Sequence, residues 1–367
     1  MRDGIRACGW MILFLIGMDI TVNLMFPYPA DPQAMPNSLE RYFEYGRSVE
    51  GKLPRIVGPT DETTQPVAAA GWLNPDDWKE QPTAAASEDG VLLAVYGMSF
   101  GADLGEWLCA HDERLTMRFI GGPAAPPNFV YAAYTMDRGR HDADVAVLAI
   151  MASSLRGMMT LTGMTVNFEQ PFPFTYPRYS VVDGTLKAVW PRILSLPELR
   201  DAMAAPAEWD LFVDQLAEHD VYYSPLLFEG TPLDHSAIVR MLRRAWAQRR
   251  NLRIIHSIHG PAGFDENQPL VPALNLMVKE FAQTCEADGI VPIVYLVNDR
   301  GYSDHLFKLL QPVLDENDTT YLSSHQFADP DNPANFIGDG HFTDSANNQI
   351  GEAFHALLAR ELGPDSD

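Results

Sequence analysis

The sequence is poor in cysteine. It has three, Cys8, Cys109 and Cys285, among 367 residues, and no pair has the C-x-x-C spacing. A thiolate zinc site normally uses such closely spaced pairs, so we do not expect one. Cys8 lies in an apolar N-terminal segment, which leaves Cys109 with Cys285 as the remaining pair for a disulfide, on geometry that a sequence does not give.

Positive charge is also scarce. Lysine and arginine number 26 against 49 acidic residues, for a formal charge of −23. A nucleic-acid-binding protein needs a basic face, so nucleic acid is not expected as a partner. The notable basic cluster lies in a helical run, and we expect it to form a solvated helix face; its members are Arg240, Arg243, Arg244, Arg249 and Arg250.

Histidines are few and scattered. His256 and His259 are three residues apart, whereas His235 and His325 stand alone. A metal site needs converging ligands, and no such pattern is present. We therefore expect neither a bound metal nor a cofactor.

An apolar stretch occupies residues 7–26, broken by Asp19 and Asn23. About 20 apolar residues span a bilayer core as a helix. Arg2 and Arg6 precede the stretch and acidic residues follow it, which favours a cytoplasmic N-terminus with the rest of the chain outside.

This stretch has two interpretations. It can be an uncleaved anchor, or a signal peptide whose apolar region is 9–18. The downstream residues form no A-x-A cleavage site, so we favour the anchor. Asp19 is costly within hydrocarbon, so it either faces a partner helix or lies near the membrane interface.

The rest of the chain divides into two predicted parts. Residues 27–86 are rich in Pro, Asp, Glu and Thr, contain one predicted helix at 38–52, and are interpreted as a linker and packing arm. Residues 87–367 form the predicted α/β domain, with an insertion at about 160–260. Within the insertion, 168–178 is dense in Phe, Pro and Tyr, which suits either an aromatic sugar platform or simple packing.

Apolar runs and helical patterns alternate through this domain. The predicted strands are Val91–Gly97, 115–120, Val145–Met151, 290–297 and Thr320–Ser323. The predicted helices are 102–111, 129–136, 271–288 and 347–361. Strands separated by helices predict a doubly wound, flavodoxin-like sheet of five parallel strands flanked by helices.

The first motif with chemical potential is Gly97-Met98-Ser99-Phe100-Gly101, between the first strand and a helix. Ligands bind parallel sheets at the carboxyl ends of their strands. Glycines permit the sharp turn, and a helix N-terminus stabilises developing negative charge. Ser99 is therefore a candidate nucleophile, although an ordinary helix cap has the same pattern.

The second motif is Gly338-Asp339-Gly340-His341, just before the last helix. A serine nucleophile needs a base, and the base needs an orienting carboxylate. His341 and Asp339 can supply both. In a doubly wound sheet this loop and Ser99 share the carboxyl edge, which strengthens both assignments.

The G-x-S-x-G pattern also occurs in α/β-hydrolases. In that fold the serine follows several strands, and the Asp and His are far apart in sequence. Here the serine follows the first strand and the pair is nearly adjacent. The α/β-hydrolase fold is therefore rejected.

The two motifs and their order instead resemble the SGNH/GDSL hydrolase superfamily, over roughly 91–153 and 290–362. The resemblance implies Ser99 as nucleophile, with Met98 where aspartate is usual, and Asp339 and His341 as its partners in a block one residue shorter than the commonest form. It also implies an oxyanion-stabilising glycine, best matched by Gly122.

The middle of the pattern departs from the family. Gly121 is the alternative oxyanion glycine. Ser153 occupies the position of the family's asparagine donor, so either its hydroxyl substitutes or another asparagine does, and Asn128 is the candidate.

The resemblance implies a serine esterase or O-acyltransferase acting on acyl esters, with an envelope or exported polysaccharide as the expected substrate. The competing hypothesis is a catalytically lapsed module that binds glycan or a membrane acyltransferase partner. In both cases the chain is expected on the outer side of a membrane, anchored or secreted.

Overall fold

The computed structural model describes residues 2–27, 29, 31, 34 and 36–363. The chain forms two compact units, each built from segments distant in sequence. The first unit comprises Met1–Ala69, Thr162–Phe174 and Leu196–Ile254. The second comprises Ala70–Leu161, Thr175–Ser195 and Ile255–Asp367. The predicted domain limits remain predictions.

The second unit contains the predicted sheet. Its five strands are all parallel in the order β2-β1-β3-β8-β9. They are β1 (Val91–Gly97), β2 (Leu115–Gly121), β3 (Val145–Met151), β8 (Val291–Val297) and β9 (Thr320–Ser323). Gly97 is in register with Gly121, and Ala149 with Tyr295. The predicted fold class is confirmed.

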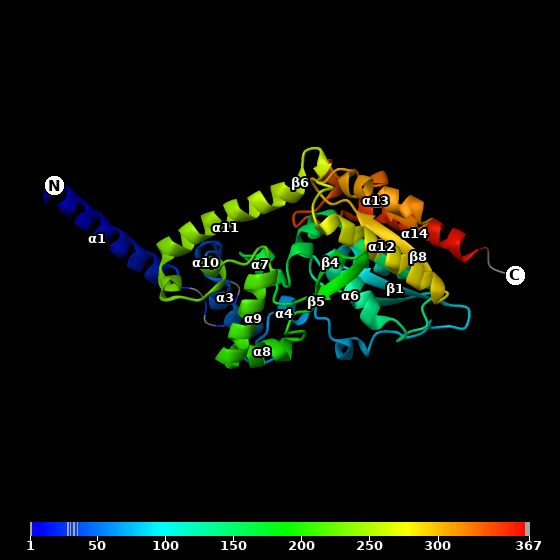
Figure 1. Cartoon of the computed structure of the whole chain (residues 1–367), viewed down its shortest axis with the longest axis horizontal. Coiled ribbons are helices and arrows are strands. Elements are labelled where there is room, and N and C mark those ends of the chain that lie inside the picture. The colour runs from blue at the N-terminus through cyan, green and yellow to red at the C-terminus, as the bar shows by residue number, and fades with distance from the viewer. Residues whose placement is uncertain (1, 28, 30, 32–33, 35, 364–367) are drawn as a thin grey trace. The chain divides into compact units, whose positions relative to one another are not determined.

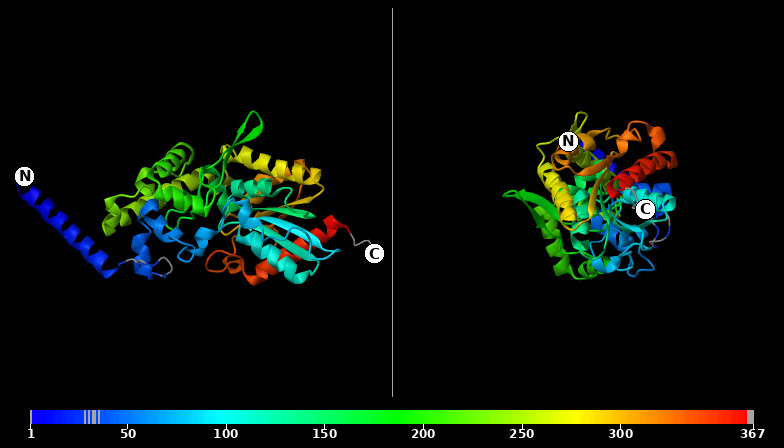
Figure 2. Two further views of the ribbon diagram at one scale, coloured as in Figure 1. Left: turned by 90° about the horizontal axis from the view of Figure 1, so that it is seen from below. Right: turned by 90° about the vertical axis from the view of Figure 1, so that its right-hand side faces the viewer.

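Helices cover both faces of this sheet. They are α5 (Ser99–His111), α6 (Pro127–Asp137), α12 (Leu270–Ala287), α13 (His305–Glu316) and α14 (Asp344–Leu362). Helices α5 and α14 pack together, whereas α12 contacts α6 and α13. In the left view of Figure 2, the yellow α12 and the red α14 lie on opposite sides of the strands. Because both faces are covered, the strands can be continuous apolar runs, and every residue of β3 is buried.

Smaller elements complete this unit. They are η1 (Pro75–Trp78), η2 (Ala152–Met159), η4 (Ser324–Gln326), η5 (Pro333–Asn335), the hairpin β4 (Arg178–Val182) with β5 (Thr185–Val189), and the pair β6 (His259–Gly260) with β7 (Gly263–Phe264). The aromatic segment 168–178 is divided between the units: Phe168 and Phe174 are buried in the first and Tyr176 in the second, which fits packing rather than a sugar platform.

The first unit is helical in the part that the structure describes (Figure 1). Its elements are α1 (Arg2–Met25), α2 (Ser38–Glu44), α3 (Val49–Val57), α4 (Pro66–Ala69), α7 (Gly163–Val166), α8 (Leu196–Ala204), α9 (Pro206–His219), α10 (Pro225–Phe228), η3 (Pro232–His235) and α11 (Ala237–Ile258), whose last turn extends past the unit. Helix α1 is long and apolar enough to cross a membrane over Asp3–Met25, and a signal sequence passes the same test.

The single helix expected at 38–52 is wrong, because the structure has two helices there. Asn37 and Glu40 form a capping box on α2, and Ser48 caps α3. Between them Gly46 lies against α11, where a Cβ would be 1.8 Å from the carbonyl oxygen of Arg240. The close approach of α11 therefore accounts for the break.

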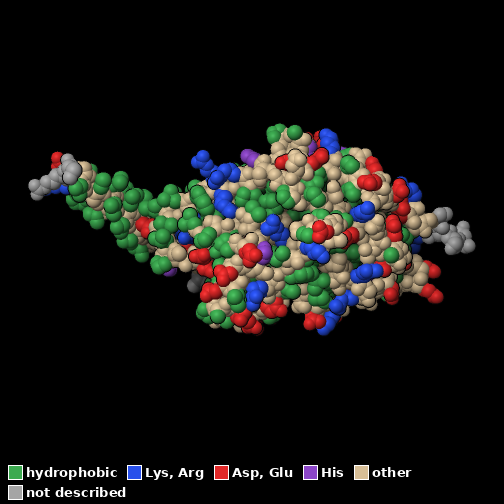
Figure 3. Space-filling model, viewed as in Figure 1, with side chains coloured by type: hydrophobic (Ala, Val, Ile, Leu, Met, Phe, Trp, Pro, Cys, Tyr) green, Lys and Arg blue, Asp and Glu red, His purple; other side chains and the backbone are tan. Residues whose placement is uncertain are grey.

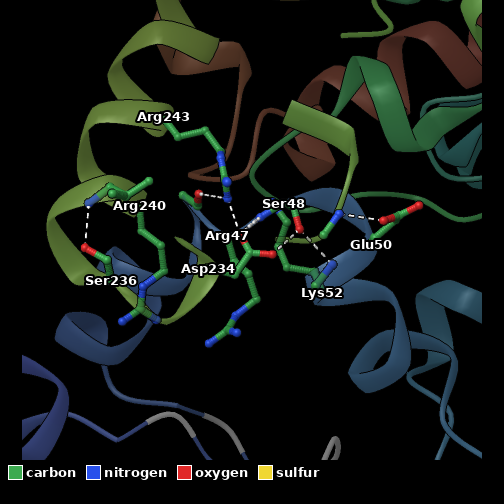
Figure 4. Close-up of polar contacts among 12 residues, drawn as sticks. Arg47, Ser48, Glu50, Lys52, Asp234, Ser236, Arg240 and Arg243 are labelled. Carbon is green, nitrogen blue, oxygen red and sulfur yellow. Dashed lines mark hydrogen bonds and ion pairs between the residues drawn. The ribbon is translucent and has the colours of Figure 1, made fainter. Parts of the chain in front are cut away.

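The prediction that the arginine cluster of α11 is a solvated face is wrong for its inner members. Arg240 and Arg243 are buried and form ion pairs with Glu44 and Asp234. Asp234 also accepts hydrogen bonds from the hydroxyl of Ser48 (2.5 Å) and its amide (3.1 Å; Figure 4). Helix α11 therefore packs within this unit partly through buried ion pairs.

The three cysteines are free thiols, so Cys109 and Cys285 do not form a disulfide. Cys285 is buried on α12 and its thiol donates to the hydroxyl of Tyr134 at 3.3 Å. Burial raises the pKa of the Cys285 thiol to about 12, so it stays protonated at neutral pH.

Candidate active site

Ser99 is the first residue of α5, immediately after β1. The turn is tight because the backbone passes close to β3: a Cβ on Gly97 would lie 2.7 Å from that of Ala149. Met98, where the resembling family has aspartate, is fully buried. Ser99 is half-buried, so its hydroxyl is placed at the carboxyl edge of the sheet with access to solvent.

The loop before α14 is a narrow hairpin. Phe336 pairs with Phe342 in an antiparallel bridge, and the amide of Ile337 donates to the carbonyl of His341 at 2.8 Å. Gly340 closes the turn by donating to Ile337 and has a φ of +96°, a conformation that favours glycine. Asp339 and His341 therefore lie on either side of a glycine that the turn requires.

The hairpin brings its polar side chains to Ser99. His341 Nε2 lies 2.6 Å from Ser99 Oγ, and His341 Nδ1 lies 3.1 Å from Asp339 Oδ1. The amide of His341 also donates to Asp339 Oδ1 at 3.1 Å. With Nδ1–H donating to the carboxylate, Nε2 is the acceptor for the serine hydroxyl.

Packing fixes the imidazole from the other side. The ring of Phe100, the residue after Ser99, stacks on His341 with centroids 5.1 Å apart and also contacts Phe342 edge-on. Because Phe100 and Phe342 are buried, the turn after β1 and the hairpin share one small aromatic cluster. The hydroxyl and the imidazole are thus held by neighbouring residues of the same cluster.

Charge is distributed unevenly around His341. Hydrogen bonds from the amide and the side chain of His341 lower the pKa of Asp339, which keeps this exposed carboxylate ionised. A second carboxylate, Asp103, lies one turn after Ser99 on α5; burial raises its pKa, and the nearby charge of His341 lowers it. Sequence reasoning missed Asp103, although its spacing of four residues from Ser99 places both on one helix face.

The proposed oxyanion donors are engaged elsewhere in this structure. The amide of Gly122 donates to the carbonyl of Gly97 at 3.2 Å, as an extension of the β1–β2 ladder. Gly122 also lies so close to Gly71 that a Cβ would be 2.7 Å from the Gly71 Cα. The side-chain amide of Asn128 is fully buried and donates to the carbonyl of Pro177 at 2.7 Å.

Ser153 lies just after β3, as predicted, but its partner is a residue that sequence reasoning missed. The Ser153 amide donates to Asp299 Oδ1 at 3.0 Å. Burial raises the pKa of Asp299, and hydrogen bonds from the hydroxyl and amide of Ser153 lower it. The signal for Asp299 was its position two residues after β8, on the same edge of the sheet as Ser99.

Nothing in the described part of the chain groups three or more His, Cys, Asp or Glu side chains as a metal ion would require. His259 and His305 approach each other, with Nε2 and Nδ1 2.8 Å apart, and the ring of His259 packs against Phe264 and Tyr302.

Comparison with known proteins adds little to this geometry. No family model and no curated protein matches the chain. Among solved structures, it is similar to a protein from Desulfitobacterium hafniense DCB-2 that is provisionally described as lipolytic and of the G-D-S-L family. The identity is 8% and the TM-score 0.33, over 73% of this chain and 100% of that chain, which is too distant a similarity to support an argument.

Proposed function

We propose that the chain is a serine-dependent ester hydrolase or O-acyltransferase. The observation that carries the proposal is the chain of contacts from the Ser99 hydroxyl through the His341 imidazole to the Asp339 carboxylate. A serine hydroxyl is a weak nucleophile, and an oriented imidazole within hydrogen-bond reach is what activates it.

In the first half-reaction, Ser99 Oγ attacks the acyl carbon while its proton passes to His341 Nε2. The carbonyl electron pair moves onto oxygen, and Asp339 stabilises the imidazolium. The oxyanion is stabilised by the N-terminus of α5, beginning with the backbone amide of Ser99. The tetrahedral intermediate then collapses, the leaving alcohol takes the proton from His341, and Ser99 retains the acyl group as an ester.

The second half-reaction decides between hydrolase and transferase. Water or a sugar hydroxyl gives its proton to His341 and attacks the acyl-serine carbon. Collapse of that intermediate breaks the bond to Ser99, which recovers its proton from His341. The open position of the pair, with His341 about one-third exposed, leaves room for either acceptor.

The test is reaction with a fluorophosphonate probe and hydrolysis of a short acyl ester such as p-nitrophenyl acetate. We expect one probe molecule per chain, attached at Ser99, and loss of both activities in Ser99→Ala. Ser154→Ala is the matched control, because the hydroxyl of Ser154 is buried and donates to the carbonyl of Met151. Near wild-type turnover in Ser99→Ala would refute the proposal.

The substrate and location form the finer part of the proposal. A retained α1 would place the enzyme on the outer side of a membrane, where O-acyl groups of envelope or exported polysaccharide are accessible. Retention is supported by contacts of α1 within its own unit, since Asp19 accepts hydrogen bonds from Ser236 (3.1 Å) and Ile238 (2.9 Å). Mature protein beginning near Ala30 or Ala34 would show that the segment is a cleaved signal instead.

A catalytically lapsed module that binds glycan or a membrane acyltransferase partner is the second candidate. The observation in its favour is that the amides of Gly122 and Asn128 already donate to backbone carbonyls. This candidate predicts glycan binding without probe labelling at Ser99, so the same probe experiment separates the two functions.

A further inference from the structure

Helix α11 has an unusual outer face. Four large apolar side chains on it are exposed: Met241 (43%), Leu242 (67%), Trp246 (37%) and Leu252 (53%). At about 100° per residue, these four side chains cover an arc of roughly 140° on the half of the helix opposite the buried Arg240 and Ala247. Exposed apolar side chains that gather on one helix face, rather than being scattered singly, indicate an interaction surface.

The charge of α11 contrasts with that of the whole chain. Its 22 residues contain six arginines and no Asp or Glu, although the chain carries a formal charge of −23. The arginines are Arg240, Arg243, Arg244, Arg249, Arg250 and Arg253.

The inner arginines have partners within the first unit. Arg240 and Arg243 pair with buried carboxylates, Arg244 pairs with Glu169, and Arg250 donates to carbonyls of residues 221–223. Arg249 and Arg253 are exposed and lie among the apolar residues of the outer face. Figure 3 shows basic and apolar atoms side by side along α11.

The start of α11 is attached to the end of α1 (Figure 1). Asp19 accepts hydrogen bonds from Ser236 Oγ and from the amide of Ile238, near the N-terminus of α11. Asn23 Oδ1 accepts a hydrogen bond from Arg240 Nη2 at 2.5 Å. A membrane that holds α1 would therefore end close to the first turns of α11.

We propose that the outer face of α11 binds the surface of an anionic phospholipid bilayer, beside the point where α1 enters it. Leucine, methionine and tryptophan would enter the boundary between headgroups and acyl chains, where a tryptophan ring is favoured. Arg249 and Arg253 would meet lipid phosphates, as basic residues at membrane surfaces do. The acidic remainder of the chain would be repelled from the same surface, so the contact has one orientation.

The test uses the full chain in nanodiscs of phosphatidylglycerol and phosphatidylcholine, with the photo-crosslinking residue p-benzoylphenylalanine at position 242. The matched control carries it at position 211, because Leu211 is 44% exposed on α9 of the same unit. We expect lipid adducts at position 242 to exceed those at 211 at least about 5-fold, given the burial expected of an interfacial helix.

Charge-reversal variants measure how much the arginines contribute to lipid binding, separately from the apolar side chains. Arg249→Glu with Arg253→Glu should lower the lipid adduct at position 242 several-fold in anionic discs, whereas Lys187→Glu with Arg300→Glu, also exposed, should leave it unchanged. Equal adducts at 242 and 211 would overturn the proposal, as would indifference to charge reversal. Adducts to a protein rather than to lipid in native membranes would also overturn it and identify a protein-binding face. The proposal rests on retention of α1 in the membrane, but its readout needs no esterase activity, so its failure and the failure of the proposed catalysis are distinguishable.

Discussion

Two clusters of polar side chains, one in each unit, are built in opposite ways. In the second unit Asp339 and His341 keep 65% and 34% of their side chains exposed, on a hairpin facing the end of a strand. In the first unit the paired side chains of Arg240, Glu44 and Arg243 are at most 7% exposed. A buried ion pair joins chain segments but cannot meet a substrate, whereas a partly open hydroxyl–imidazole–carboxylate arrangement can.

The energetic logic differs in the same way. Moving two charges out of water costs several kcal/mol per ion, which their mutual attraction only roughly offsets. Such pairs therefore contribute more to which segments pack together than to net stability. For the exposed pair of Asp339 and His341 the cost of desolvation is small, and the carboxylate contributes to catalysis by orienting the imidazole.

The comparison is tested most severely at His341. We expect His341→Ala to reduce kcat about as much as Ser99→Ala, by on the order of 10⁴-fold or more, because members of a triad act as a unit. Asp339→Asn should cost less, since its exposed carboxylate orients the base in a solvated setting. Steady-state kinetics on a short acyl ester would measure both.

Asp344→Asn is the control for Asp339→Asn, because Asp344 is an exposed carboxylate at the start of α14. It should retain full activity. If Asp344→Asn were harmful and Asp339→Asn were not, the assignment of the orienting carboxylate would be wrong.

The buried pair gives the opposite prediction. Asp234→Ala leaves Arg243 buried without its carboxylate, which should destabilise the first unit by about 3–5 kcal/mol. Urea unfolding followed by hydrogen exchange of peptides from α3 and α11 would measure the loss. The turnover of molecules that remain folded should be unchanged.

A double replacement provides the control for this effect. Asp234→Leu with Arg243→Met removes both charges and should be less damaging than Asp234→Ala alone, because no uncompensated charge is left. A double variant that is just as unstable would mean that the hydrogen bonds to Ser48, rather than the ion pair, hold this region together.

Much of the sheet unit is readable from the sequence because its signals are local. The bounds of β1, β3 and β9 follow directly from apolar runs ended by glycine or polar residues. The proximity of Ser99 to His341 follows from topology, since both lie at the carboxyl edge of one sheet. The helix α13 was missed because a proline, Pro312, interrupts its apolar pattern.

The first unit was less predictable because its signals are distant in sequence. The break between α2 and α3 depends on Gly46 meeting the backbone of Arg240, nearly two hundred residues later. The burial of Arg243 depends on Asp234, nine residues earlier, which is held in turn by Ser48, 186 residues away from Asp234. In the second unit, Gly122 lies where an oxyanion-stabilising glycine was expected, yet its amide already donates to the carbonyl of Gly97 in the strand ladder.

A smaller expected effect is a pH dependence of the free energy of unfolding that arises in the first unit. Burial lowers the pKa of Lys52, on α3, from the ordinary 10.5 to about 7. Between these values the unfolded chain binds a proton that the folded chain lacks, so the free energy of unfolding rises with pH, by up to about 1.4 kcal/mol per pH unit. Lys52→Met should remove this slope between pH 7 and pH 10, as measured by urea unfolding.

Lys187→Met is the matched control for the pH experiment, because Lys187 is exposed on the β4–β5 hairpin of the other unit. It should leave the pH dependence as it is in the wild type. A wild-type slope that survives in Lys52→Met would assign the proton uptake to another buried group.

The smallest expected effect concerns the oxyanion hole. Losing one oxyanion donor typically reduces kcat by ~10²–10³-fold. The hydroxyl and amide of Ser153 both donate to Asp299, so the carboxylate competes with the oxyanion for the hydroxyl proton. We therefore expect Ser153→Ala to reduce kcat by less than that range, about 10-fold, with little change in KM. Ser154→Ala, whose hydroxyl is bonded to Met151, should be silent on the same assay.

Asn128→Ala completes this comparison. Its amide is buried and donates to the carbonyl of Pro177, so truncation should affect folding before it affects turnover. A silent Ser153→Ala beside an Asn128→Ala that folds but has lost kcat would move the third donor to Asn128. If both variants fold and keep full kcat, the oxyanion is held by backbone amides alone. In the resembling family, an asparagine side chain provides part of the stabilisation of the oxyanion. Here the N-terminus of α5 would provide that part as well.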